Sequence, residues 1–323
     1  MLGVDVGGTK VAAGPVDAAG ALRAPPLVES SGAADATSFL AGLESTLRRA
    51  MALFADHNPR GIGLAWAGTV DSDRGLVVES PNLPLQQIPL AGVLRDALGI
   101  PVILENDVNA AVLAEATAGA AAGLRHVVML TLGTGVGGGL LLDGKLFRGA
   151  GGGAGELGHT VVAAGGEPCP CGSRGCLEMY ASGGALVRYA GARAGDPGLD
   201  PDGGLLRLRE AGKLTGRAVT DMAREGHPGA LAAVRELAGW LGIGLVNVTN
   251  IFDPDMILVG GGVAELGELL LEPAREIVRR TAMSPNRDVR IATAALGNTA
   301  GLVGGGLAAW AALAPAGDAV SRG

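Results

Sequence analysis

Apolar residues follow two patterns along the chain: short continuous runs, and spacings of three or four residues. Apolar runs at 2–6 and 10–17 flank a glycine-rich bend, which predicts a hairpin. The helical spacing of Leu, Met and Phe predicts a helix over 36–54. A second hairpin with a glycine-rich bend is predicted over 126–147. Two copies of this arrangement indicate a duplicated α/β unit, with one copy in each of two lobes around a cleft.

We expect the two lobes to divide near residue 108. Residues 1–108 would form a small N-terminal lobe, and residues 109–297 a large C-terminal lobe. A final helix at about 298–323 is expected to pack back onto the first lobe. The chain has 323 residues, enough for a core in each lobe. Because no low-complexity linker separates the lobes, we expect a hinged pair.

The composition excludes several classes of partner. A net charge of −7 disfavours nucleic acid, which favours a basic surface. The first residues, "MLGVDVGGTK", already look like folded structure and not like a secretory signal, so we expect a cytoplasmic protein. The uncharged stretch 291–317 is long enough to cross a bilayer, but it contains six glycines with Asn298 and Thr299 near its middle. We interpret it as a buried strand and helix, and expect no membrane contact.

Glycine-rich turns follow three predicted strands. The first, "DVGGTK", lacks Walker A spacing, but its backbone N–H groups, Thr9 and Lys10 can face an anion, and Asp5 can hold a hydrated cation. One such turn alone is better explained as a hairpin that needs positive φ. Three together favour a nucleotide, with the third turn admitting adenine or a phosphate. The candidate nucleotide-binding residues are Asp5, Gly7, Gly8, Thr9, Lys10, Gly133, Thr134, Gly135, Gly137, Gly138, Gly260, Gly261 and Gly262.

All cysteines of the chain lie in one short segment. Their odd number, the close spacing of the first two and a reducing cytosol argue against disulfides, and buried free thiols are the alternative. Zinc takes four N or S ligands in a tetrahedron, so we predict a structural zinc site that shapes a loop presenting Glu156 and Glu178. The other histidines, among them His227, lack such partners in the sequence and are interpreted as surface or cap residues. The candidate zinc ligands are His159, Cys169, Cys171 and Cys176.

Carboxylates and amides mark a second kind of site. The segment "ENDVNA" follows a predicted strand, at the strand end where open α/β sheets bind ligands. Asp107 can act as a general base toward a hydroxyl, and its alternative role is the N-cap of the next helix, which Asn106 can also fill. Together with Asn82, Glu156 and Glu178, these side chains suit a polyol. The residues alone therefore favour a hydroxylated small molecule and a nucleotide as ligands.

The motifs "DVGGTK", "ENDVNA", "LGTGVGGG", E-x-G-H and "CPCGSRGCLE" resemble those of the ROK family of bacterial sugar kinases, repressors and uncharacterised open reading frames. The likeness extends from residue 2 to about 312. Within the family, "WAG", "SPNLP", "YASG" and "LGNTAGLVG" look most like actinobacterial-type glucokinases. The resemblance implies an actin-like ATPase (ribonuclease H-like) fold and ATP-dependent phosphorylation of a hexose, with D-glucose first, on its 6-hydroxyl.

The resemblance also implies roles for individual residues. Asp107 matches the catalytic base of the family, and His159 matches a position that binds both zinc and sugar. Asp5 and the turns at 7–10 and 133–138 match the Mg-ATP site. Met179 and Leu177 depart from the glucokinase pattern beside a sugar ligand. The residues that match sugar ligands are Gly68, Asn82, Asn106, Asp107, Glu156, His159 and Glu178.

Three alternatives stay open from the sequence. The acceptor can be another hexose or an N-acetylhexosamine: N-acetylmannosamine, N-acetylglucosamine, mannose or fructose. Polyphosphate can replace ATP as donor, although the cysteine cluster argues for ATP. A sugar-responsive repressor is disfavoured by the acidic charge, and because only four residues precede Asp5, where a DNA-binding domain would be expected. The family implies a homodimer, with a tetramer as the alternative.

Overall fold

The structure is a computed structural model, which describes residues 1–32, 35–80 and 83–313. Within it the chain forms two compact units. Unit 1 comprises Met1–Gly123, Lys145–Ala154 and Ala295–Gly323, and unit 2 comprises Leu124–Gly144 and Gly155–Ala294.

Unit 1 extends beyond the boundary expected near residue 108. Helix α3 (Asp107–Ala118) begins at that position and packs against α10 (Ala300–Leu313), so both helices belong to unit 1. The separate segment 145–154 also belongs to unit 1. The part of the expected final helix at 314–323 lies outside the described residues.

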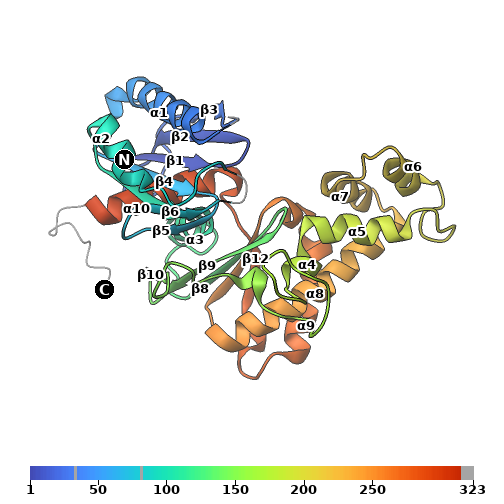
Figure 1. Ribbon diagram of the computed structural model, residues 1–323. Helices are drawn as coiled ribbons and strands as arrows, with labels where there is room; N and C mark the ends of the chain where they lie inside the picture. Colours follow the sequence, from blue (N-terminus) through green and yellow to red (C-terminus); the bar gives the residue numbers. More distant parts are fainter. Residues whose placement is uncertain (33–34, 81–82, 314–323) are drawn as a thin grey trace. The chain divides into compact units, whose positions relative to one another are not determined.

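The sheet of unit 1 has the order β3-β2-β1-β4-β7. Strand β1 is antiparallel to β2 and parallel to β4, which in turn is parallel to β7 (Figure 1). The elements of unit 1, besides α3 and α10, are β1 (Leu2–Val6), β2 (Lys10–Pro15), β3 (Leu27–Ser30), α1 (Ala36–Leu53), η1 (Ala55–His57), β4 (Ile62–Trp66), β5 (Thr69–Asp71), β6 (Leu76–Glu79), α2 (Leu90–Leu98), β7 (Val102–Asn106), β10 (Lys145–Leu146) and η5 (Gly297–Thr299).

Unit 2 repeats this arrangement. Strand β8 is antiparallel to β9 and parallel to β11, and β11 is parallel to β12. The expected duplication of one α/β unit is therefore confirmed. The elements of unit 2 are β8 (Val127–Leu132), β9 (Val136–Leu142), η2 (Leu157–His159), α4 (Glu178–Ala181), α5 (Gly183–Arg193), α6 (Gly204–Glu210), α7 (Gly216–Arg224), α8 (Pro228–Phe252), β11 (Met256–Gly260), η3 (Gly262–Leu266), α9 (Glu268–Thr281), η4 (Asn286–Asp288) and β12 (Arg290–Thr293).

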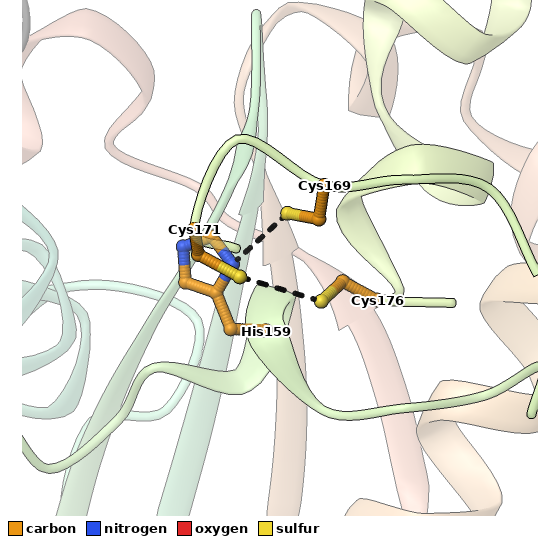
Figure 2. Close-up of side chains that lie close together, drawn as sticks. All are labelled: His159, Cys169, Cys171 and Cys176. Carbon is orange, nitrogen blue, oxygen red and sulfur yellow. Dashed lines mark hydrogen bonds between the residues drawn. The ribbon is translucent and has the colours of Figure 1, made fainter. Parts of the chain in front are cut away.

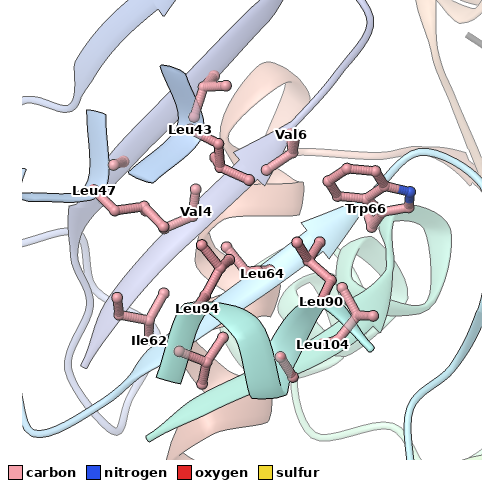
Figure 3. Packing of buried hydrophobic residues seen from close by; sticks show 14 of the residues in the cluster. Val4, Val6, Leu43, Leu47, Ile62, Leu64, Trp66, Leu90, Leu94 and Leu104 are labelled. Carbon is pink, nitrogen blue, oxygen red and sulfur yellow. The ribbon is translucent and has the colours of Figure 1, made fainter. Parts of the chain in front are cut away.

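The central strands of unit 1 carry large apolar residues on one face and small residues on the other. Because side chains alternate along a strand, Ile62, Leu64 and Trp66 of β4 share a face, where they pack with α1 and α2 (Figure 3). On the opposite face, a Cβ on Gly63 would lie 1.8 Å from the carbonyl oxygen of Gly305 in α10. This face needs glycine, because the backbones of strand and helix touch. The buried side chains with the largest volume include Leu2, Leu47, Ile62, Leu64, Trp66, Leu90, Leu94 and Leu104.

One helix among the described residues, α8, is long and apolar enough to cross a membrane by length and composition. Of its most apolar window, 56% is buried inside the structure. A core helix of a globular protein passes the same test. Helices α9 and α5 pack against α8 more extensively than any other element does. The stretch 291–317, which was interpreted as a strand and a helix, forms β12 and α10 over its described part.

Candidate active site and metal centre

The segment "ENDVNA" changes from strand to helix between Asn106 and Asp107. Asn106 has extended backbone angles and caps α3, since its side-chain oxygen accepts from the backbone N–H groups of Val108 (2.9 Å) and Asn109 (3.0 Å). Its Nδ2 donates to the carbonyl oxygen of Gly68 at 3.1 Å. Asn106 thus fills the cap role that the sequence left open between it and Asp107, and Asp107 occupies the first position of the helix.

Asp107 is half-buried at this helix start. Its Oδ1 accepts hydrogen bonds from Asn106 Nδ2 and from the backbone N–H of Val108, both at 3.0 Å. Burial, and then the negative charge of Asp5, raise the pKa of Asp107 to about 7, although these hydrogen bonds oppose the shift. A carboxylate with a pKa near neutrality is suited to take a proton from a hydroxyl at physiological pH.

Asp5 occupies the last part of β1, directly before the first glycine turn. Burial raises its pKa, and the charge of Lys10 opposes that shift. A Cβ on Gly301 of α10 would lie 2.9 Å from the carboxyl group of Asp5, so α10 also needs a glycine here. Gly7 donates to the carbonyl oxygen of Lys10 at 3.0 Å and closes the turn. A half-buried carboxylate beside a turn of backbone N–H groups is a site that a hydrated cation with phosphates would suit.

Positive φ explains few of the candidate glycines. Among the glycines of the three candidate nucleotide turns, all of them described, only Gly261 has a positive φ, +85°. Close packing explains others: a Cβ on Gly135 would lie 2.1 Å from Glu178 Oε2, and one on Gly138 would lie 2.2 Å from the carbonyl oxygen of Gly155. The plain hairpin explanation, which rests on positive φ, therefore fails for the turns at 7–10 and 133–138.

The second and third turns lie side by side in unit 2. Strands β8 and β11 are parallel neighbours, with Gly260 opposite Thr131, so their carboxyl ends meet at one edge of the sheet. A Cβ on Gly261 would lie 2.5 Å from the carbonyl oxygen of Leu132. The backbone N–H of Val136 donates to Glu178 Oε2 at 3.1 Å, which fixes Glu178 against the 133–136 turn. One candidate sugar ligand therefore touches a candidate phosphate turn.

The four candidate zinc ligands form a compact cluster in unit 2 (Figure 2). One ligand atom from each of His159, Cys169, Cys171 and Cys176 lies within 4.8 Å of the others. Cys169 Sγ lies 3.6 Å from His159 Nδ1, and Cys171 Sγ lies 3.7 Å from Cys176 Sγ. The latter distance excludes a disulfide, whose sulfur atoms are about 2 Å apart. All three cysteines are free.

The loop between these ligands depends on glycine. Gly175 has a φ of +81°, and a Cβ there would lie 1.8 Å from the carbonyl oxygen of Ala163. Gly172 has a φ of +90° and follows Cys171 directly. The two ring nitrogens of His159 face different groups, because Nδ1 is near Cys169 and Nε2 lies 4.0 Å from Glu156 Oε2. The imidazole can therefore serve a metal and a second ligand at once.

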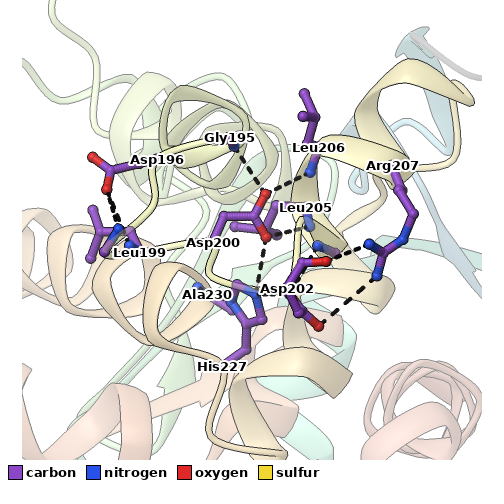
Figure 4. A network of polar contacts seen from close by, with 12 residues as sticks. Gly195, Asp196, Leu199, Asp200, Asp202, Leu205, Leu206, Arg207, His227 and Ala230 are labelled. Carbon is purple, nitrogen blue, oxygen red and sulfur yellow. Dashed lines mark hydrogen bonds and ion pairs between the residues drawn. The ribbon is translucent and has the colours of Figure 1, made fainter.

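A second group of metal-ligand side chains, Asp200, Asp202 and His227, was missed in the sequence (Figure 4). Asp200 is buried and accepts from the backbone N–H groups of Gly195, Leu205 and Leu206, each at 2.9 Å. His227 caps α8 through Nδ1, which accepts from a backbone N–H, so Nε2 carries the proton that faces both carboxylates. An Nε2 that carries a proton cannot bind a metal. Asp200 and His227 instead hold the N-terminal ends of α6 and α8 together.

Each unit carries part of the predicted site. Unit 1 holds Asp5, Gly68, Asn106 and Asp107 and the first turn, whereas Glu156, Glu178, the cysteine cluster and the other two turns belong to unit 2. Asn82 lies outside the described residues. Sequence reasoning missed Glu105 and its partner Arg148. The available signal was an acidic residue in an otherwise apolar strand, which requires a partner when it is buried.

Comparison with known proteins gives the family. The model of the ROK family matches residues 1–313. The chain belongs to the ROK family. It is 40% identical over 309 residues to a glucokinase of Streptomyces coelicolor, which covers 94% of this chain and 95% of that protein. A ROK family glucokinase from Streptomyces griseus, crystallised with glucose and AMPPNP, is 38% identical with a TM-score of 0.80, over 95% of this chain and 97% of that one.

Regulators of the family also match. A xylose repressor of Caldicellulosiruptor bescii is 34% identical over 220 residues, which are 68% of this chain and 54% of that protein. The likeness to the ROK kinases confirms the actin-like ATPase fold that the motifs implied.

The raised pKa of Asp107 predicts a pH-dependent gain in stability for Asp107→Asn. Between about pH 4 and pH 7 the folded protein holds a proton that the unfolded chain has lost, so wild-type stability falls as pH rises through this window. Asparagine does not ionise. Its advantage in the free energy of unfolding should therefore grow across the window and reach the order of 4 kcal/mol at pH 8, because each pKa unit corresponds to about 1.4 kcal/mol.

Urea unfolding at pH 4, 6 and 8 measures this difference. Asp96→Asn is the matched control, because the side chain of Asp96 is 72% exposed, and we expect its effect to stay small at every pH. Parallel stability curves for Asp107→Asn and wild type would show that Asp107 has an ordinary pKa.

Proposed function

We propose that the protein is an ATP-dependent hexose kinase that phosphorylates D-glucose on its 6-hydroxyl. The observation that carries this proposal is the half-buried carboxylate of Asp107, whose pKa of about 7 makes it a base at neutral pH. Two relatives support the choice of substrates, since one is named a glucokinase and the other was crystallised with glucose and an ATP analogue.

In the proposed reaction Asp107 accepts the proton of the 6-hydroxyl as the oxygen attacks the γ-phosphorus of ATP. The bond from that phosphorus to the β,γ-bridging oxygen breaks, and ADP leaves. Asn106 keeps Asp107 in place, because it caps α3 and donates to Oδ1 of the base. Oδ2 is then the oxygen that we assign to the substrate hydroxyl.

The other sugar contacts are assigned to residues of both units. Asn106, the Gly68 backbone, Glu156, His159 and Glu178 would bind ring hydroxyls, as would Asn82 outside the described residues. The buried position of Leu177 removes one objection to glucose, since its side chain is 1% exposed and packs against Gly244. The departure from the glucokinase pattern at this position therefore concerns the core of unit 2 and not a sugar contact.

ATP would bind at the glycine turns. The turns at 7–10 and 133–138 would face phosphates, with Thr9, Lys10 and Thr134 as further donors, and 260–262 would face the adenine or a phosphate. Mg²⁺ would neutralise charge on the phosphates. The carboxyl of Asp5 suits its hydration shell, because carboxylates are the ligands that this ion prefers and burial disfavours an uncompensated charge there.

The cysteine cluster suits structural zinc. In a tetrahedron with Zn–S bonds of about 2.3 Å, the ligand atoms lie roughly 3.7 Å apart. The distances of 3.6 Å and 3.7 Å within the cluster agree with that arrangement. Four protein ligands would leave no open position, so we assign zinc the task of holding the loop between Glu156 and Glu178. We further propose a cytoplasmic homodimer, with a tetramer as the alternative.

Release of ADP across a panel of hexoses and N-acetylhexosamines tests the function. We expect the highest kcat/KM with D-glucose, and no release without a sugar. Asp107→Asn should lower kcat by about 10²- to 10⁴-fold, the contribution of a general base, while glucose binding by calorimetry is kept.

A wild-type protein that is inactive toward every sugar would contradict the kinase. A preference for an N-acetylhexosamine would change the acceptor only, and near-normal turnover of Asp107→Asn would refute its role as the base.

Zinc content tests the metal assignment. Protein purified without chelators should contain about one zinc ion per chain by elemental analysis. Cys176→Ser should lose the metal and expose the 159–178 loop to limited proteolysis, because a buried ligand is gone. Ser173→Ala, in the same loop, should keep both the metal and the resistance. A wild-type protein that is folded and fully active without metal would contradict the assignment.

A further inference from the structure

A partly buried ion pair joins Arg148 to the last part of β7, just before Asn106 and Asp107. Glu105, the residue before Asn106, has a side chain that is 1% exposed, whereas that of Arg148 is 36% exposed. Oε2 of Glu105 accepts from Arg148 Nε at 2.8 Å and from Arg148 Nη2 at 2.5 Å. Among the described residues, Arg148 is the only cation paired with this carboxylate.

The other oxygen of Glu105 accepts hydrogen bonds from two residues that flank the proposed base and from Ser72. Oε1 accepts from the backbone N–H of Asn106 at 3.1 Å, from Asn109 Nδ2 at 3.2 Å and from Ser72 Oγ at 3.2 Å. Asn106 and Asn109 belong to the turn that holds Asp107, on either side of it. The orientation of the Glu105 carboxylate therefore affects the position of the backbone at Asn106 and Asp107.

Arg148 also begins a closed strap, defined here as residues 148–154. Its carbonyl oxygen accepts from the backbone N–H of Ala154 at 3.0 Å, which closes the strap on itself. Gly152 has a φ of +79°, and a Cβ there would lie 2.6 Å from the carbonyl oxygen of Val70 in β5. The strap is thus held to unit 1 at two points, and the chain then continues through Gly155 to Glu156.

We infer that Arg148 is a positioning residue for the kinase reaction. Its guanidinium holds both the backbone around Asp107 and the strap that leads to Glu156. Through Glu105 it acts on the first turn of α3, which carries Asp107. Through the strap it acts on Glu156, a proposed sugar ligand. This inference rests on the proposed function. The alternative is that the ion pair only stabilises the fold of unit 1.

The two explanations differ in what the variants Arg148→Met, Glu105→Gln and their combination do. Arg148→Met leaves a buried carboxylate without its cation, so both explanations expect lower stability. The double variant has no buried charge, and its stability should recover. If Arg148 only stabilises the fold, activity should recover with it. If Arg148 positions the site, activity should stay low, because the guanidinium no longer holds the strap or the turn.

Steady-state kinetics of these variants, together with urea unfolding, test the inference. We expect Arg148→Met to lower kcat by about 10- to 100-fold and to raise the KM for glucose, with the KM for ATP unchanged, since a small misplacement of reacting groups costs about this much. Arg148→Lys should fall between, because an ammonium cannot reproduce the two-nitrogen contact. Arg95→Met is the matched control: it breaks an exposed ion pair with Asp96 in the same unit and should change neither quantity.

A double variant that regains both stability and wild-type kcat would overturn the inference, as would a folded Arg148→Met with unchanged kinetics for glucose. Either result leaves the kinase proposal intact, because the wild type is active in the same assay. A wild type that phosphorylates no sugar would overturn the proposed function and this inference with it.

Discussion

A half-buried carboxyl group at the start of a helix is the constraint on which the proposed site depends. Burial makes the charged form of Asp107 unfavourable, and the nearby charge of Asp5 adds to this. The surrounding chain limits the cost with hydrogen bonds from Asn106 and from the backbone of Val108. The result is a carboxyl group with a pKa near neutral pH, and a fold that loses stability when this group is charged. Asparagine would avoid this cost but cannot accept a proton, so the proposed role of Asp107 as the base explains why a carboxyl group stands here.

The neighbourhood of this carboxyl is arranged by backbone approach more than by large side chains. Glycines at positions 63 and 301 let α10 lie directly against the sheet and against Asp5. In unit 2, Gly135 leaves space for Glu178, which accepts a backbone N–H of the same turn. Through Glu178, a proposed sugar ligand and a proposed phosphate turn are linked inside one unit. A methyl group at position 301 would displace Asp5, and one at position 135 would displace Glu178.

Local patterns predicted the features that lie close together in the sequence. The hairpins, the switch from strand to helix at Asn106, and the Cys and His spacing are all set within a few residues, and the structure brings the four predicted zinc ligands together. What was missed depends on long-range contacts. Arg148 meets Glu105, and His227 meets Asp200, through folding that no local spacing reveals. For the same reason, the two units do not divide at residue 108 as expected. Helix α3 belongs to unit 1 because it packs against α10, which is distant in the sequence.

The pH dependence of kcat/KM for glucose is the most direct test of the central claim that a carboxylate with a pKa near neutrality is the base, because this ratio reports groups of the enzyme before glucose binds. Because only the ionised form of Asp107 accepts a proton, kcat/KM should be constant above about pH 8 and fall about tenfold per unit below pH 7. A kcat/KM that stays constant down to pH 5, in protein shown to be folded there, would contradict it.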